Sequence, residues 1–354
     1  MSLSNYASMT MLEADMVRDA AKSFVQDKSP ISVVRAAEAG DWTDANASWL
    51  TIGELGWLEI MQYEDSQADG LVAACIIAHE LGRGASPVPY IESAVLALPL
   101  LAKYAKQLVA LDEYSTGEKR VAIAMPLAGF PNQQQLLPNA QASSSWIVNQ
   151  LESADLLVVP MLNNGQPTLA LIECQDNKLS SQSMPDMANN SFSKISGDVL
   201  NDAILIELPW QALAQAFDHY RLATSSYVVG LASQAFDMTV EYAKERIAFD
   251  KPIGSFQAVQ HRLAESALEL CAAQLLVQEA SVTGNSVEIP MVCIQACEAG
   301  KKATFTAQQI WAGMGYTLEV DVQLFFRRAR ANQLLLGTPW ELRSRVWAEV
   351  VPHS

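Results

Sequence analysis

Residues 222–243 restrict the possible folds of this chain more than any other region. Small and apolar residues recur there alternately four and three positions apart: Leu222, Ser226, Val229, Ser233, Phe236, Val240 and Ala243. This period is typical of a helix that packs along its whole length against other helices, and its small residues allow close approach. The sequence therefore predicts a long helix inside a C-terminal helical bundle.

The rest of the chain divides into two parts with different patterns. Residues 9–115 look helical: Leu12, Met16, Ala20 and Phe24 recur four positions apart, and the almost wholly apolar run 71–82 predicts a buried helix. Between 119 and 210, short β-rich runs alternate with turn-forming residues; these runs are 121–125, 146–149, 156–162, 168–173 and 203–208. We predict a mainly α fold with a central β domain, divided into domains 1–117, 118–211 and 212–354.

Composition and charge exclude several classes of function. The chain has 354 residues, of which 50% are hydrophobic and 18% charged. The charged fraction is below the usual ~25%, which favours surface buried between subunits. A formal net charge of −16 argues against nucleic-acid binding and against binding to anionic membranes. Any phosphate-bearing ligand would depend on local Arg and Lys side chains.

Cysteine and histidine usage predicts neither disulfides nor a metal site. The five cysteines are odd in number and scattered, and the four histidines show no metal-ligand spacing. The chain begins without a signal-peptide pattern, and no apolar run reaches the roughly 20 residues needed to span a membrane. We therefore expect a cytoplasmic protein that does not enter membranes.

The segment 245–261 carries the most specific motif. A helix pattern ends at a Pro/Gly break, a second helix follows, and Arg246, Phe249, Ile253 and Gln257 are spaced as in R-x-x-F-G-x-x-I-x-x-x-Q. Residues 309–316 are similar to Q-x-x-G-G-x-G-Y, with Gln309 and Gly313 in place. Residues 79–83 and 325–330 add weaker matches. In order and spacing, these segments resemble the acyl-CoA dehydrogenase family over nearly the whole chain.

This resemblance implies a fold, a cofactor and partners. The fold would comprise an N-terminal helical domain, a middle β-barrel-like domain and a C-terminal four-helix bundle. The cofactor would be FAD and the substrate an acyl-CoA. The assembly would be a dimer or tetramer with itself or with a homologous subunit, and electron-transfer flavoprotein would be the electron acceptor.

The family pattern also assigns cofactor-binding residues. Arg246, Phe249, Gln257, Gln309 and Gly313 match positions that a family subunit offers to the FAD of its dimer mate, and Ile253 matches a further cofactor-binding position of the same motif. A forked, permanently charged guanidinium such as that of Arg246 suits a phosphate, and glycine lets the main chain approach a ligand closely. Trp146 and Thr338 match further flavin-contacting positions.

The departures from the family pattern fall on the catalytic base and on the chain's own flavin contacts. The family's catalytic Glu stands before a Gly-Thr pair, where this chain has Leu336; in a subset it stands directly before an Arg, where this chain has Tyr220. Leucine cannot accept a proton, and a tyrosine with a pKa near ~10 is a poor base at neutral pH. In the β domain, family hydroxyl positions become Ala124, Phe130 and Val148, while the framework residues Pro126, Ala128 and Gly129 remain.

Three hypotheses follow, and they leave open whether this chain is itself an enzyme. The first is a base-less partner subunit that contributes part of the FAD site to a homologous catalytic subunit. The second is a self-sufficient, homo-oligomeric acyl-CoA dehydrogenase with a relocated base; Asp218 and Glu341 are candidates, although both are poorly aimed. The third is a flavin-free structural protein with the same fold.

Overall fold

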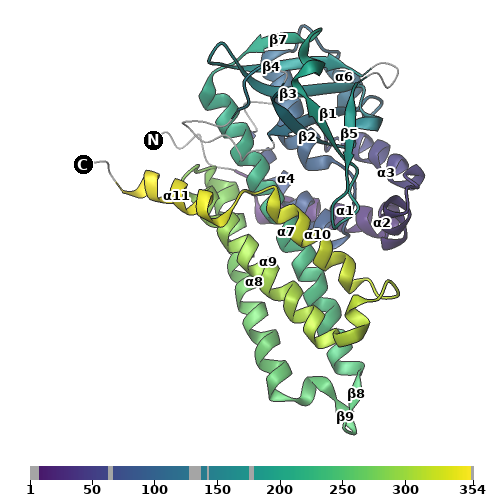
Figure 1. Cartoon of the computed structure of the whole chain (residues 1–354). Coiled ribbons are helices and arrows are strands. Elements are labelled where there is room, and N and C mark those ends of the chain that lie inside the picture. Colours follow the sequence, from purple (N-terminus) through teal and green to yellow (C-terminus); the bar gives the residue numbers. More distant parts are fainter. Residues whose placement is uncertain (1–7, 63–66, 127–136, 142, 175–178, 352–354) are drawn as a thin grey trace.

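The structure is a computed structural model that describes residues 8–62, 67–126, 137–141, 143–174 and 179–351. Helices make up the N-terminal and C-terminal parts of the described chain, and a sheet lies between them in sequence (Figure 1). The predicted class, mainly α with a central β domain, is confirmed. The domain limits at 117/118 and 211/212 remain predictions. Residues 127–130, which include Ala128, Gly129 and Phe130, lie outside the described residues.

The N-terminal part is built from short helices around an apolar centre. Its helices are α1 (Met11–Lys28), α2 (Ile31–Glu38), α3 (Thr43–Glu54), α4 (Gln67–Arg83), the π-helix η3 (Ile91–Ala97), α5 (Leu98–Tyr104) and α6 (Leu111–Ser115). The Thr10 hydroxyl and the Glu13 carboxylate cap α1 reciprocally, which satisfies amide groups that a helix start leaves unpaired. The apolar run predicted as a buried helix is α4, whose Leu71, Ala74 and Ala78 are almost fully buried.

A seven-stranded sheet forms the middle of the chain. Its strands are β1 (Val121–Pro126), β2 (Ser145–Asn149), β3 (Leu156–Asn163), β4 (Gln166–Glu173), β5 (Ser181–Met184), β6 (Phe192–Ser196) and β7 (Ile204–Glu207). Their spatial order is β5-β6-β2-β1-β3-β4-β7, and among these pairs only β1–β3 is parallel. All five predicted strands are present. The sequence reading missed β5 and β6, because their polar residues lack the apolar runs that identified the others.

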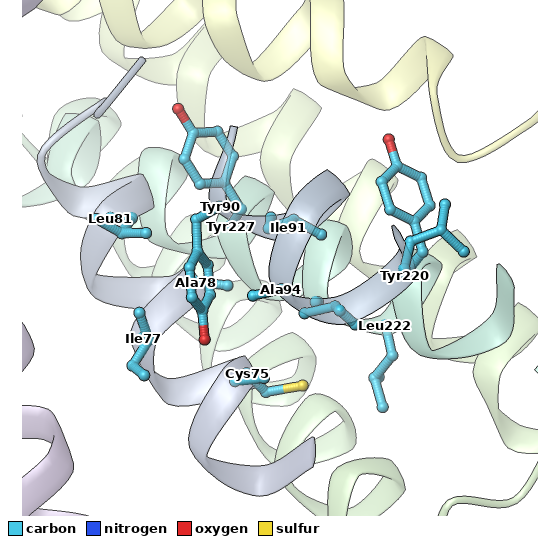
Figure 2. Packing of buried hydrophobic residues seen from close by; sticks show 14 of the residues in the cluster. Cys75, Ile77, Ala78, Leu81, Tyr90, Ile91, Ala94, Tyr220, Leu222 and Tyr227 are labelled. Atoms are coloured by element: carbon cyan, nitrogen blue, oxygen red, sulfur yellow. The ribbon is translucent and has the colours of Figure 1, made fainter. Parts of the chain in front are cut away.

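The C-terminal part is the predicted helical bundle, built on the 36-residue helix α7 (Trp210–Glu245). The hairpin β8 (Ile247–Ala248) and β9 (Lys251–Pro252) follows, then α8 (Gln257–Thr283), α9 (Glu288–Trp311), α10 (Val322–Leu334) and α11 (Pro339–Val350). Helix α7 packs closely on α4. A Cβ on Gly230 would lie 2.0 Å from the backbone oxygen of His79, and one on Gly82 would lie 2.2 Å from the backbone oxygen of Tyr227. A side chain at either glycine would therefore clash with the other helix. Figure 2 shows side chains of α4, η3 and α7 meeting in the resulting cluster.

Candidate cofactor-binding and catalytic sites

The hairpin after α7 positions the first group of predicted FAD contacts at one end of the bundle (Figure 1). The backbone N–H of Arg246 donates to the backbone carbonyl oxygen of Tyr242 (2.9 Å), and the backbone carbonyl oxygen of Arg246 accepts from the backbone N–H of Ile253 (2.8 Å). Phe249 and Asp250 turn the hairpin with φ of 54° and 63°. A two-residue hairpin loop has positive φ at both positions, which Asp adopts readily and a bulky residue such as Phe249 does not. Strain of this kind is concentrated at functional sites. The Phe249 side chain is 88% exposed.

The C-terminal end of α9 joins this group. The rings of Tyr242 and Trp311 stack at 4.0 Å, and the Tyr242 hydroxyl lies 3.8 Å from the Met314 sulfur. These contacts hold the turn η7 (Ala312–Tyr316), and with it Gly313, against the end of α7. Gly313 is exposed, and a Cβ added there would meet no atom within 4 Å. The preceding Ala312 has φ 53° and ψ −134°, a conformation suited to the glycine that the family motif has at this place.

The structure therefore brings six of the eight predicted cofactor residues to one end of the bundle. Arg246, Phe249, Gln257, Gln309 and Gly313 are exposed there, and Ile253 is partly buried. Within the described part of the chain, the Arg246 guanidinium has no hydrogen-bonding or charged partner. An exposed cation without a partner and an open glycine backbone suit the phosphate end of FAD.

Trp146 and Thr338 lie elsewhere and have structural partners. Trp146 of β2 is fully buried within the sheet's own core, and its indole N–H donates to the Pro160 oxygen (3.0 Å). Thr338 caps α11: its hydroxyl and its backbone N–H lie 2.8 and 2.7 Å from a Glu341 carboxylate oxygen. The cofactor roles of both residues remain predictions, and neither side chain belongs to the group at the bundle end.

Both expected positions of the catalytic base lie in the interior. Leu336 is fully buried, and Tyr220 is 1% exposed. Burial, with a smaller effect from the nearby Glu92 carboxyl, raises the pKa of Tyr220 well above its usual value of 10. Tyr220 is therefore protonated at neutral pH, and neither position holds a group that accepts a proton there.

The cavity beside Tyr220 is small, about 40 Å³. It contains a carboxyl that the sequence reading missed, that of Glu92 in η3, which accepts from the Asn149 side-chain amide (3.0 Å). Burial raises the pKa of Glu92, which favours the protonated form. A single charged residue inside the apolar run 91–101 was the signal that could have identified it.

The two alternative bases have other contacts. Asp218 is 3% exposed and binds two arginines: Arg345 in a bidentate pair (2.6 and 2.7 Å) and Arg221 (3.0 Å). Glu341 completes the cap of α11 with Thr338. Among the described residues, no group of three or more His, Cys, Asp and Glu side chains could hold a metal ion. No described helix combines the length and apolar character that a membrane span requires.

Comparison with known proteins adds to this geometry. Residues 12–109 match the family description "Acyl-CoA dehydrogenase, N-terminal domain", and residues 210–349 match "Acyl-CoA dehydrogenase, C-terminal domain". Together the two matches cover most of the chain. This chain belongs to the acyl-CoA dehydrogenase family.

Relatives of the family align with nearly its full length. Acyl-CoA dehydrogenase IpdE2 of Mycolicibacterium smegmatis is 28% identical over 345 residues, covering 96% of this chain and 99% of the relative. A variant of the Tcur3481-Tcur3483 steroid ACAD has a TM-score of 0.81 at 23% identity and covers 95% of this chain and 96% of its own. The ChsE4-ChsE5 complex from Mycobacterium tuberculosis has a TM-score of 0.79 at 19% identity and covers 98% and 99%. The two structural matches support the fold.

Proposed function

We propose that this chain is the base-less partner subunit of a heteromeric acyl-CoA dehydrogenase. It contributes part of the FAD site to a homologous subunit that carries the catalytic Glu. One observation carries the proposal. The predicted contacts to a neighbour's FAD are gathered and mostly exposed at the bundle end, whereas both base positions are buried and hold no carboxylate, and the cavity beside Tyr220 has a volume of only about 40 Å³.

The sizes of the sites support this asymmetry. A cavity of about 40 Å³ holds one or two water molecules and is far below the roughly 300–1,000 Å³ typical of small-molecule sites. An acyl thioester beside Tyr220 would require the interior to open. The exposed contacts at the bundle end require no such opening, because they already face outward.

The compared structures support a heteromeric assembly. Two of them are named as pairs of different chains, Tcur3481-Tcur3483 and ChsE4-ChsE5, and one of these is named as a steroid enzyme. By analogy, the substrate would be an acyl-CoA, in the direction of steroid or fatty-acid side-chain oxidation. When bound, FAD would accept a hydride from the substrate's β-carbon. This chain's part would be to hold the cofactor's phosphates through Arg246 and its adenosine end near Gln309 and Gly313.

Purification in two forms tests the proposal. The chain is expressed alone and with a homologue that carries the Glu, and the visible spectrum and mass of each product are recorded. We expect a colourless dimer alone and a flavin-containing complex with the homologue. A yellow homo-oligomer that oxidises acyl-CoA by itself would contradict the proposal. A protein that never gains flavin would favour a structural role.

A second candidate, the self-sufficient enzyme with a relocated base, has one observation in its favour. Glu92 places a carboxyl in the same cavity as Tyr220, and its raised pKa is the shift expected for a tuned acid–base group. Replacing Glu92 by Gln keeps a hydrogen-bonding side chain and removes the base. If the purified chain alone oxidises acyl-CoA and Glu92→Gln loses that activity at least 100-fold, this candidate replaces the partner-subunit proposal.

A further inference from the structure

A groove between α8 and α9 extends from the predicted FAD contacts. Its volume is about 910 Å³, and Gln309 and Ala312 form part of its wall. Three cationic residues line it: Arg262, Lys301 and Lys302. Lys302 is held by Glu265 (3.6 Å) and Glu269 (3.4 Å). Two carboxylates, Glu265 and Glu298, also line the groove, so three cations face two anions there and the balance is slightly positive in a chain whose net charge is −16. Arg262 and Lys301 are both exposed.

Arg262 contacts one of the predicted cofactor residues directly. Its Nη1 donates a hydrogen bond to Gln309 Oε1. A guanidinium has five donor hydrogens, so this bond leaves others for an anion. The bond also fixes which end of the Gln309 amide is occupied, and it links the first turns of α8 to the end of α9. Arg262 lies outside the motif that identified Gln257 and Gln309.

An unpaired polar side chain and two aromatic rings complete the groove. Gln308 is 2% exposed, and neither polar atom of its side chain has a hydrogen-bond partner among the described residues. Unpaired buried amides are rare, and each calls for an explanation such as an absent ligand or water. The rings of Phe305 and Tyr316 are 47% and 74% exposed on the wall of the groove. Exposed aromatic rings are platforms on which nucleic-acid bases stack.

We propose that Arg262 is a phosphate-binding residue that also positions Gln309, in a groove that takes the adenosine-diphosphate end of a dinucleotide. The proposal rests on the proposed function, because it adds this residue to the FAD contacts offered at the bundle end. Adenosine diphosphate is common to FAD and CoA, so the shared chemistry is an adenine ring followed by phosphates. The dinucleotide assigned here is FAD.

Three variants of the full chain test the assignment, in whichever form retains flavin, alone or with the catalytic homologue. Arg262→Met keeps the apolar stem and removes the charge; Arg262→Lys keeps the charge and removes the fork. Arg18→Met, on the distant helix α1, makes the same change at a surface arginine paired with Asp15. Dissociation constants for FAD and for an acyl-CoA are measured at two salt concentrations, with thermal unfolding as the check on folding.

We expect Arg262→Met to weaken FAD binding roughly 10- to 100-fold, the size of one charge-assisted hydrogen bond. Its FAD affinity should also depend less on salt. Arg262→Lys should recover part of the loss, and Arg18→Met should stay within threefold of the wild type. A merely structural role for Arg262 would lower the unfolding temperature without this partial recovery or this salt effect.

The contrary outcomes are distinguishable. FAD affinity within threefold of wild type in Arg262→Met overturns the inference and leaves the proposed function standing. Weaker acyl-CoA binding with unchanged FAD binding assigns the groove to CoA and overturns the FAD assignment. If no form of the wild type binds FAD, the proposed function fails. In that case, calorimetric titration of wild type and Arg262→Met with ADP tests the role of Arg262 independently. Equal ADP affinity in the two proteins would overturn the assignment of Arg262 as a phosphate-binding residue.

Discussion

The two ends of α7 present opposite environments. At its C-terminal end, Arg246 and the hairpin are exposed, Phe249 holds a strained backbone, and the Arg246 side chain has no partner among the described residues. Near its N-terminal end, Tyr220 and the Asp218 carboxylate are buried, and Asp218 is paired twice. One helix thus has an exposed end with a strained backbone and a buried end where a carboxylate is paired with two arginines.

This difference separates stability from binding. Backbone strain costs of order 1–3 kcal/mol per residue, and it persists where the surrounding structure or a function requires it. In the interior around Asp218 the charges are instead paired, because this carboxylate binds both Arg221 and Arg345. We therefore expect changes near Tyr220 to alter the free energy of unfolding, and changes at the bundle end to alter ligand affinity.

Removing the buried carboxylate should have the largest effect. Asp218→Ala leaves Arg221 and Arg345 without their shared anion in the interior. Breaking a buried pair in this way costs about 3–5 kcal/mol of unfolding free energy, measured by urea denaturation. The exposed pair Glu241–Lys244 at the other end of α7 is the control, where Glu241→Ala should cost under about 1 kcal/mol. Equal losses at the two pairs would remove the contrast.

Arg246→Ala should show the reverse pattern. Because the side chain is exposed and unpaired within the described residues, we expect the free energy of unfolding to change by less than about 0.5 kcal/mol. FAD retention in the complex should weaken roughly 10- to 100-fold, since a phosphate loses a charged donor. Flavin fluorescence on dilution measures it. Unchanged retention would mean that Arg246 contacts no cofactor.

Much of the fold could be predicted because its signals are local. The spacing from Leu222 to Ala243 identified α7, and the apolar run 71–82 identified α4. The strands β5 and β6 could not be predicted, because polar residues such as Ser181 and Lys194 are held there by pairing with distant strands.

The candidate site was predictable only where a motif recorded it. Spacing located Arg246 and Gln309 but could not show that Trp146 is enclosed in the sheet or that Thr338 caps α11. Glu92 and Arg262 were missed for the same reason. Each acquires its role from neighbours far away in sequence, Asn149 in one case and Gln309 in the other.

His219, which is buried beside Asp218, offers a pH test of the interior. Burial lowers the pKa of His219 to about 4, although the neighbouring Asp218 acts in the opposite direction. The folded state then binds fewer protons than the unfolded state between pH 6.5 and 4, so stability falls as the pH falls through this window. From pH 7.5 to 5.5, we expect this histidine to reduce the unfolding free energy by about 1 kcal/mol. Urea denaturation of wild type and His219→Gln at both pH values isolates the contribution of this histidine to the unfolding free energy. If the two proteins lose the same stability between these pH values, the prediction is wrong.

Tyr220→Phe should produce the smallest change. This variant distinguishes a tyrosine that only packs at the position of the catalytic base from one that takes part in proton transfer. A buried phenol with a raised pKa supplies no phenolate at neutral pH, so we expect the dehydrogenation rate of the complex to stay within about twofold. The unfolding free energy should fall by no more than about 1 kcal/mol, the worth of one hydroxyl contact. Tyr227→Phe, which removes a hydroxyl that donates to the backbone oxygen of Ser86 (2.9 Å), is the matched control for a purely structural phenol.

A rate loss of 100-fold or more in Tyr220→Phe alone, measured by flavin reduction in single turnover, would identify a tyrosine that takes part in proton transfer. The interior would then be an active site in its own right, and the contrast between the two ends of α7 would no longer hold.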